Sequence, residues 1–204
     1  ALRLGQWSCL LGRAARRPAP IQATWFGYMC TTGLEAMDYR ITDAYLAPSG
    51  ESEQFYSEKL VRIHAAAVFS PAPDCPAVNA PPSLQSGFVT FGSFNSYAKI
   101  DDEVIAVWAR ILNALPSSRL LLVALGGDDA SVRQGIEGRF ARLGLAGGAA
   151  QLDVRGRTAF SGFLDALQEV DIALDPFPYS GGTTSLHTLW MGVPIVALEG
   201  DSEL

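Results

Sequence analysis

The chain has 204 residues, of which 49% are hydrophobic and 18% are charged, and its 15 basic and 21 acidic side chains give a formal net charge of −6. This composition supports a packed core and excludes global disorder. The acidic balance disfavours a duplex nucleic-acid partner, which would require a basic face. Three cysteines and two histidines are scattered along the chain, so neither a disulfide framework nor a metal site is predicted.

The sequence also argues against a membrane protein. No apolar run approaches the roughly 18 residues that a membrane span requires. Arg3, Arg13, Arg16 and Arg17 interrupt the opening stretch, which therefore does not fit a signal peptide. Sparse cysteines are typical of a cytoplasmic protein, and we expect that location. Because the chain lacks an initial methionine and stops just after an apolar strand-like run, we expect it to be a fragment.

The first 86 residues are irregular. They are predicted to hold strands at Ile21–Phe26 and Tyr39–Thr42 and a short helix over Ser52–Leu60. The segment Phe69–Ser86 contains five prolines and little periodicity, which is typical of a linker. A domain boundary is expected near residues 80–87.

From residue 87 onward, strands and helices alternate. A helix opened by Asp101–Glu103 carries apolar residues at the spacing of one helix face and ends before Pro116. The continuous apolar run Leu120–Leu125 predicts a strand covered on both faces. The alternation implies a parallel, Rossmann-like sheet. The other predicted elements are strands at Phe88–Phe91, Leu152–Val154, Asp171–Asp175 and Ile195–Leu198, and helices at Val132–Leu143, Phe163–Val170 and Thr183–Met191.

The strongest candidate site is the loop Pro176–Ser185, between a predicted strand and the helix that follows it. Ligands of open α/β sheets bind at this carboxyl edge. Gly181 and Gly182 allow the backbone to approach a ligand, and free amides at a helix start favour an anion. Thr183 and Thr184 add hydroxyl donors. An ordinary helix N-cap with a glycine-rich turn explains the local sequence equally well.

A second candidate is Lys99, in the segment Phe94–Asp101 that follows the first strand of the same domain. This segment is expected at the same edge of the sheet as the glycine loop, where a lysine could neutralise a phosphate. Taken alone, Lys99 fits a solvated surface lysine better. Together with the glycine loop, the phosphate hypothesis becomes at least as strong.

Other side chains carry weaker signals. His187 lies one helical turn past Thr183 and could face a ligand, although a surface or half-buried histidine is commoner. Asp171 and Asp175 flank an apolar strand and are interpreted as its polar ends. The sequence contains no GxSxG, HExxH or Asp-x-Asp motif, which disfavours a serine hydrolase, a zincin and a metal-dependent sugar transferase of the Asp-x-Asp kind.

Taken in order, these motifs resemble the catalytic region of the O-linked N-acetylglucosamine transferases (glycosyltransferase family 41), in particular the bacterial SPINDLY-like branch. The match covers nearly the whole chain. The matching segments are Arg17–Tyr28, Thr31–Gly33, Met37–Asp43, Tyr56–Leu60, Phe91–Asn95, Lys99–Ile100, Asp171–Asp175 and Gly181–Pro194.

The resemblance implies a two-domain GT-B glycosyltransferase that transfers GlcNAc from UDP-GlcNAc, with inversion, to Ser or Thr of proteins. Residues 1–86 would be the end of the first Rossmann-like domain plus the linker, and residues 87–204 the start of the nucleotide-sugar-binding domain. Tetratricopeptide repeats are expected upstream, and no metal or cofactor besides the donor substrate is implied. The fragment is expected to be inactive alone.

The resemblance also implies roles for individual residues. Lys99 would contact the donor diphosphate, and Thr183 and Thr184 would cradle it at a helix start. Ser96 occupies a position near the phosphates that is commonly glutamine. The stretch around Gly27 would line the sugar side of the cleft.

The chain departs from the family pattern at several positions. His187 replaces an acid that serves the ribose hydroxyls, and Phe163 aligns with a histidine at the uracil side. Met29-Cys30 stands where Pro-Gly is usual. Two alternatives therefore stay open. One is a GT-B enzyme with another UDP-sugar or an Asn acceptor, and the other is a degenerate nucleotide-sugar-binding or protein-interaction module.

Overall fold

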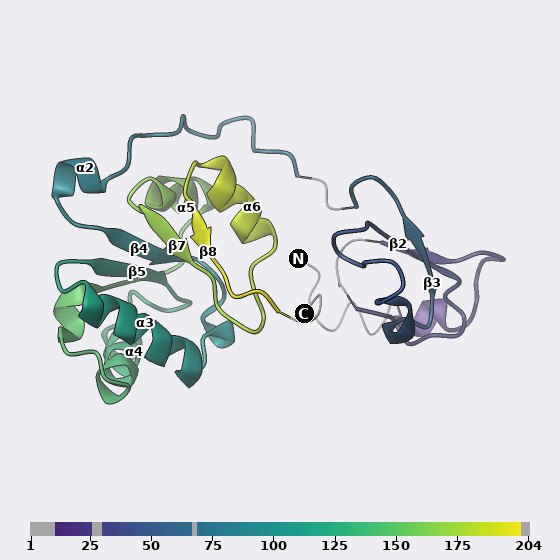
Figure 1. The fold of residues 1–204 in the computed structure, drawn as a ribbon, viewed down its shortest axis with the longest axis horizontal. Helices are drawn as coiled ribbons and strands as arrows, with labels where there is room; N and C mark the ends of the chain where they lie inside the picture. Colours follow the sequence, from purple (N-terminus) through teal and green to yellow (C-terminus); the bar gives the residue numbers. More distant parts are fainter. Residues whose placement is uncertain (1–10, 26–29, 67–68, 201–204) are drawn as a thin grey trace. The chain divides into compact units, whose positions relative to one another are not determined.

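The computed structural model describes residues 11–25, 30–66 and 69–200, and two compact units divide between Phe69 and Ser70 (Figure 1). The first unit extends to Phe69, and the second comprises Ser70–Glu199. Each unit is built around a parallel β-sheet, so the predicted α/β class is confirmed. Within the described ranges, no helix combines the length and apolarity needed to cross a bilayer.

The first unit holds a three-stranded parallel sheet in the order β1-β2-β3. The helix predicted over Ser52–Leu60 is wrong, because only a short 3-10 helix forms and the chain then enters β3. Glu58, which is 5% exposed, explains the difference: its carboxylate accepts from the Thr32 amide at 2.6 Å and the Thr31 hydroxyl at 2.7 Å. These tertiary bonds extend the chain where local propensity favours a helix. The elements are β1 (Ala23–Thr24), β2 (Tyr39–Thr42), η1 (Glu53–Phe55) and β3 (Lys59–Arg62).

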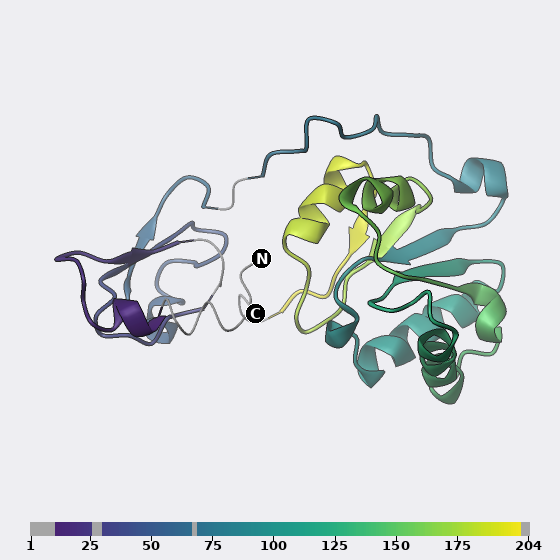
Figure 2. The ribbon, with the colours of Figure 1, turned by 180° about the vertical axis from the view of Figure 1, so that it is seen from behind.

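The second unit holds a five-stranded parallel sheet in the order β6-β5-β4-β7-β8, with α3 and α4 on one face and α5 and α6 on the other (Figures 1 and 2). The predicted alternation from residue 87 is confirmed. Its elements are α2 (Ser83–Ser86), β4 (Thr90–Ser93), η2 (Tyr97–Lys99), α3 (Asp102–Ala114), β5 (Arg119–Val123), α4 (Ala130–Arg142), η3 (Gly148–Gln151), β6 (Leu152–Arg155), α5 (Phe160–Leu167), β7 (Ile172–Leu174), α6 (Thr183–Trp190) and β8 (Ile195–Val196).

Local sequence sets the ends of α3. The Asp101 side chain caps its first turn by accepting from the Val104 amide at 2.9 Å. The helix ends just before Leu115 and Pro116, as predicted. Its apolar stripe, which includes Trp108 at 2% exposure, packs on the sheet.

The continuous apolar run in β5 serves both faces of the sheet. Leu120 and Leu122 pack in the layer of α3 and α4, whereas Leu121 packs with Ala166 and Val170 in the other layer. A strand buried on both faces needs apolar residues at every position, and this explains the sequence pattern.

The strand order creates a topological switch at β4. From β4 the chain first builds outward through β5 and β6, then returns to place β7 on the other side of β4. In open parallel sheets, ligands bind in the crevice at the carboxyl ends of the strands at such a point. The loops that follow β4 and β7 are the two segments that carry the candidate residues.

The proline-rich segment that was interpreted as a linker is attached along the second unit. The Asn79 side chain donates to the Gln168 carbonyl at 2.9 Å, and Gln168 Nε2 donates to the Ala77 carbonyl at 3.0 Å. Asp171 accepts from the amides of Ser83 and Thr90, both at 2.9 Å. Asp171 therefore fastens the end of this segment to the start of β4.

Replacement of Phe140, which is fully buried under the sheet, tests this packing. Phe140→Ala should lower the free energy of unfolding by about 3–5 kcal/mol through lost burial and a cavity. Val132→Ala on the same helix, where the side chain is 37% exposed, should cost less than about 1 kcal/mol. Urea unfolding followed by circular dichroism measures both, and equal effects would contradict the assigned core.

Candidate functional site

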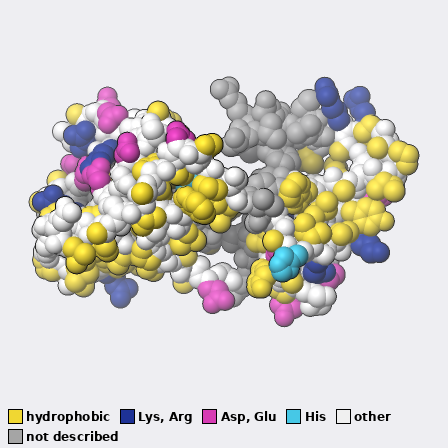
Figure 3. Space-filling model, turned by 90° about the horizontal axis from the view of Figure 1, so that it is seen from above, with side chains coloured by type: hydrophobic (Ala, Val, Ile, Leu, Met, Phe, Trp, Pro, Cys, Tyr) yellow, Lys and Arg dark blue, Asp and Glu magenta, His cyan; other side chains and the backbone are white. Residues whose placement is uncertain are grey.

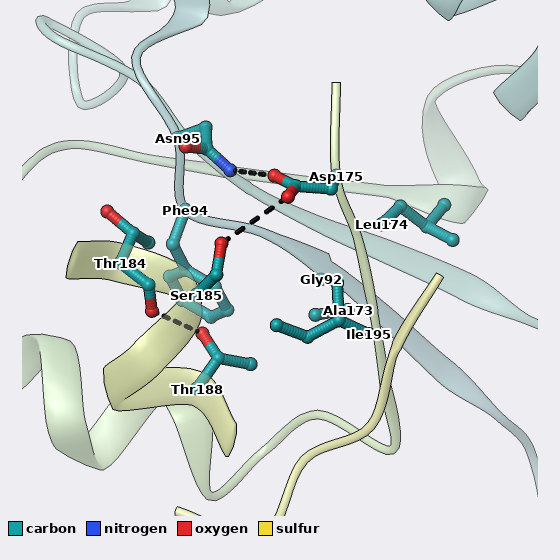
Figure 4. Close-up of a pocket in the computed structure, with 10 residues that line it drawn as sticks. All are labelled: Gly92, Phe94, Asn95, Ala173, Leu174, Asp175, Thr184, Ser185, Thr188 and Ile195. Atoms are coloured by element: carbon teal, nitrogen blue, oxygen red, sulfur yellow. Dashed lines mark hydrogen bonds between the residues drawn. The ribbon is translucent and has the colours of Figure 1, made fainter. Parts of the chain in front are cut away.

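Asp175 organises the carboxyl edge of the sheet between β4 and β7 (Figure 4). Its side chain is 7% exposed and accepts from Asn95 Nδ2 at 2.5 Å, which joins the ends of the two strands. Both carboxylate oxygens accept from the Gly181 amide at 3.0 Å, and Oδ2 also accepts from the Ser185 hydroxyl at 3.3 Å. One carboxylate thus holds β4, the glycine loop and the start of α6.

Only glycine fits at position 181, because the surrounding atoms leave no space for a side chain. A Cβ at this position would meet the Ser185 hydroxyl and would lie 3.0 Å from oxygen atoms of both Asn95 and Asp175. Its amide is engaged by Asp175, so it is not among the free amides that the sequence suggested for an anion. By helix geometry, the amides without an intrahelical acceptor are those of the first turn of α6.

Lys99 reaches across from the loop after β4 to the loop after β7. Its Nζ donates to the Ser180 carbonyl at 2.9 Å and lies 4.2 Å from the centre of the Tyr179 ring. Burial lowers the pKa of Lys99 below its ordinary value, while the negative charge of Asp175 acts in the opposite direction. The structure therefore places Lys99 and the glycine loop at the same edge, as the order of the strands predicts.

Four further candidates lie in the loop after β4 or at the start of α6. Gly182 is the N-cap residue of α6, and Thr183, at the first helical position, is exposed. Thr184 is partly buried, and its carbonyl accepts from the Thr188 hydroxyl at 2.9 Å. Ser96 precedes η2, and its carbonyl accepts from the Lys99 amide at 2.9 Å. Ser96 thus supports the turn that presents Lys99.

An aromatic cluster lies where α5 meets α6. The His187 ring is 5.0 Å from that of Phe160 and 6.1 Å from that of Phe163 between centroids, and Phe163 is 5.6 Å from Phe94. Burial lowers the pKa of His187 below the ordinary value of 6.5, which favours a neutral imidazole near pH 7. Phe94 connects this cluster to the end of β4. Gly27 lies outside the described residues.

The enclosed space beneath the glycine loop is small. It is lined by Asp175, Asn95, Thr184 and Ser185 among others and has a volume of about 10 Å³, room for about one water molecule (Figure 4). A larger ligand would therefore lie over the edge of the sheet, against Lys99 and the start of α6. In the ranges that the structure describes, no cluster of three or more His, Cys, Asp or Glu side chains could hold a metal ion.

Figure 3 shows no extended patch of Lys and Arg side chains on the visible face of the second unit, where basic side chains stand among acidic ones. In the same unit, Arg155 forms an ion pair with Glu169 at 2.7 Å. The positive charge at the site comes from Lys99 and from the first-turn amides of α6, a combination that suits a small anionic ligand.

Comparison with known sequences decides the family. The sequence profile of glycosyl transferase family 41 matches residues 13–70 and 80–203. The chain belongs to glycosyl transferase family 41. The predicted resemblance is thereby confirmed.

Two relatives of known sequence support this family assignment. A barley (Hordeum vulgare) protein named "Probable UDP-N-acetylglucosamine--peptide N-acetylglucosaminyltransferase SPINDLY" is 44% identical over 93% of this chain and 20% of its own length. The protein of the same name from Arabidopsis thaliana is 44% identical over 93% of this chain and 21% of its own length. The chain therefore spans about a fifth of the length of these curated relatives.

A solved structure extends the likeness to three dimensions. A mutant O-GlcNAc transferase of Thermobaculum terrenum superimposes with a TM-score of 0.83 at 41% identity, over 93% of this chain and 35% of that chain. This agreement confirms the GT-B fold that the resemblance implied for the family 41 chain.

Sequence reasoning missed the central role of Asp175. It was interpreted as the polar end of a strand, and Asn95 was not singled out beyond its motif. A usable signal was present, because Asp175 directly follows β7 and Asn95 lies two residues after β4, and a parallel order with a switch at β4 makes these strands neighbours.

Two adjacent glycines in the family 41 chain provide a test of this geometry. Gly181→Ala should lower the free energy of unfolding by about 1–3 kcal/mol, because the new methyl group displaces Ser185 or Asp175. Gly182→Ala should cost less than about 1 kcal/mol, since no atom lies within 4 Å of the added Cβ. Thermal and urea unfolding measure both variants, and a harmless Gly181→Ala would contradict the geometry.

The depressed pKa of His187 predicts a pH dependence of stability. Between the folded and the unfolded pKa, the unfolded chain binds more protons, so this contribution to stability is lost as pH falls below about 6.5. Urea unfolding at about pH 7.5 and about pH 6 should therefore show a larger loss in the native chain than in His187→Phe. The same loss in both proteins would show that His187 does not carry the effect.

Proposed function

We propose that this chain carries the donor-nucleotide site of a protein O-linked N-acetylglucosaminyltransferase. The reaction would be inverting transfer of GlcNAc from UDP-GlcNAc to Ser or Thr of proteins. Membership of family 41 and the names of the relatives support this activity. The observation that carries the proposal is the convergence of Lys99 with the start of α6 at the switch point of the sheet.

The chemistry of sugar transfer fits these groups. As the acceptor hydroxyl attacks the anomeric carbon and UDP leaves, negative charge grows on the diphosphate. The Lys99 ammonium, the first-turn amides of α6 and the hydroxyls of Thr183 and Thr184 would stabilise that charge. Because these donors are fixed by the fold, they cost little reorganisation in the transition state. We propose no metal ion or further cofactor for this step.

The nucleoside would lie toward the aromatic cluster. Phe163 offers an apolar ring at the base side, and a neutral His187 can donate to or accept from a ribose hydroxyl. Ser96 would lie beside the phosphates, and Gly27 is assigned to the sugar side from the resemblance alone. Gly181 would act by allowing the loop to lie close to Asp175.

The wider setting is also part of the proposal. The acceptor would be a Ser or Thr hydroxyl of a protein, with tetratricopeptide repeats expected upstream of the catalytic region. A cytoplasmic location is supported by the sparse cysteines, of which Cys30 and Cys75 are free thiols in the structure.

Calorimetric titration with UDP, with ADP and GDP as controls, tests the site directly. UDP should bind selectively, and Lys99→Ala should weaken its affinity about tenfold to a hundredfold through the loss of a charge-assisted contact. Lys59→Ala is a matched control, because the chain has only two lysines and Lys59 lies exposed on β3 of the other unit. It should leave UDP affinity unchanged.

Other results would contradict the proposal. Equal affinity for UDP, ADP and GDP would remove the support for a UDP-sugar donor. Unchanged UDP affinity in a folded Lys99→Ala variant would show that the nucleotide does not bind against this lysine.

A further inference from the structure

A single peptide group connects Asp175 to Lys99. The N–H of the Ser180–Gly181 peptide donates to both oxygens of Asp175 at 3.0 Å, and its C=O accepts from Lys99 Nζ at 2.9 Å. In a trans peptide, the N–H and the C=O point in opposite directions from one rigid plane. The buried carboxylate and the ammonium group are therefore fixed relative to each other through this plane.

Asp175 is a buried, hydrogen-bonded carboxylate with a fixed position. Besides the Gly181 amide, its carboxylate accepts from Asn95 at the end of β4 and from Ser185 in the first turn of α6. Gly181 and Ser185 belong to one continuous segment after β7, whereas Asn95 comes from the segment after β4, which meets the first only at the switch point. Asp175 is 7% exposed, and these hydrogen bonds occupy both oxygens of its carboxylate. The position of the carboxylate is therefore fixed by the surrounding fold.

We propose that Asp175 is a positioning residue, which acts through the Ser180–Gly181 peptide to place the Lys99 ammonium for the donor diphosphate. The inference rests on the proposed function for the identity of the ligand, but the link between the two side chains does not. An ammonium has three donors, and only one is used by the Ser180 carbonyl. The others are oriented by this bond and by the face of the Tyr179 ring.

The charge of Asp175 has a second consequence for Lys99. Burial disfavours the charged lysine, and the carboxylate compensates in part. Hydrogen bonding to a carboxylate also polarises the peptide group, which strengthens its carbonyl as an acceptor. The titratable groups that the structure places against Lys99 are Asp175 and Tyr179.

A double-mutant cycle on UDP affinity tests the proposal, with calorimetry on the native chain, Asp175→Asn, Lys99→Ala and the double variant. In the presence of Lys99, Asp175→Asn should weaken UDP binding about tenfold. In the Lys99→Ala background, the same change should cost less than about twofold, because the residue through which it acts is gone. Equal losses in both backgrounds would overturn the proposal.

Asp171→Asn is the matched control for a merely structural role. Asp171 lies at the other end of β7 and, like Asp175, accepts hydrogen bonds from more than one segment of the chain. Its donors are the backbone amides of Ser83 and Thr90, and none of them lies in the glycine loop. Asp171→Asn should lower thermal stability and leave UDP affinity unchanged. If it weakened UDP binding as much as Asp175→Asn, the effect of Asp175 would be general stability.

A nucleotide-free readout separates this proposal from the proposed function. With 13Cε-lysine labelling, NMR shows only Lys59 and Lys99, so Lys99 can be titrated with Lys59 as an internal reference. Asp175→Asn should lower the pKa of Lys99. An unchanged titration would overturn the proposal, whereas a lowered pKa in a chain that fails to bind UDP would contradict only the proposed function.

A second variant keeps the test available if Asp175→Asn does not fold. Asn95→Ala removes the 2.5 Å bond that anchors the carboxylate and leaves its charge in place. It should weaken UDP binding by a smaller factor and only when Lys99 is present. A loss that is independent of Lys99 would again contradict the proposed role.

Discussion

The arrangement of this edge of the sheet depends on the burial of one carboxylate. Burial of the Asp175 carboxylate would be costly if its oxygens had no hydrogen-bond donors. Its donors come from the segment after β4, from the glycine loop and from α6. The parallel order of the strands brings these donors together. By binding the Gly181 amide, the Asp175 carboxylate fixes the position of the glycine loop at this edge.

The hydrogen bonds of Asp175 also fix where Lys99 lies relative to the start of α6. The lysine is attached to the loop through the Ser180 carbonyl, and the loop is attached to Asp175. A cation and a helix start that face one place form an anion site, which under the proposed function would hold the diphosphate of the donor. The aromatic cluster of Phe160, Phe163 and His187 lies beside this edge, where the proposed function would place the nucleoside.

Much of the second unit could be predicted from local sequence, since the apolar stripe of α3 and the continuous apolar run of β5 each determine one element. The helix expected at Ser52–Leu60 failed because the contacts of Glu58 with Thr31 and Thr32 override local propensity. The role of Asp175 could not be derived locally, because its partner Asn95 is 80 positions away in the chain. The motifs identified the candidate segments, and long-range hydrogen bonds set the geometry in which these segments meet.

A crystal structure of the complex with UDP tests the central claim most directly. A phosphate oxygen should lie within hydrogen-bond distance of Lys99 Nζ and of the first-turn amides of α6, with the Gly181 amide still bound to Asp175. A diphosphate bound away from Lys99, or a Gly181 amide turned from Asp175 toward the phosphate, would contradict it.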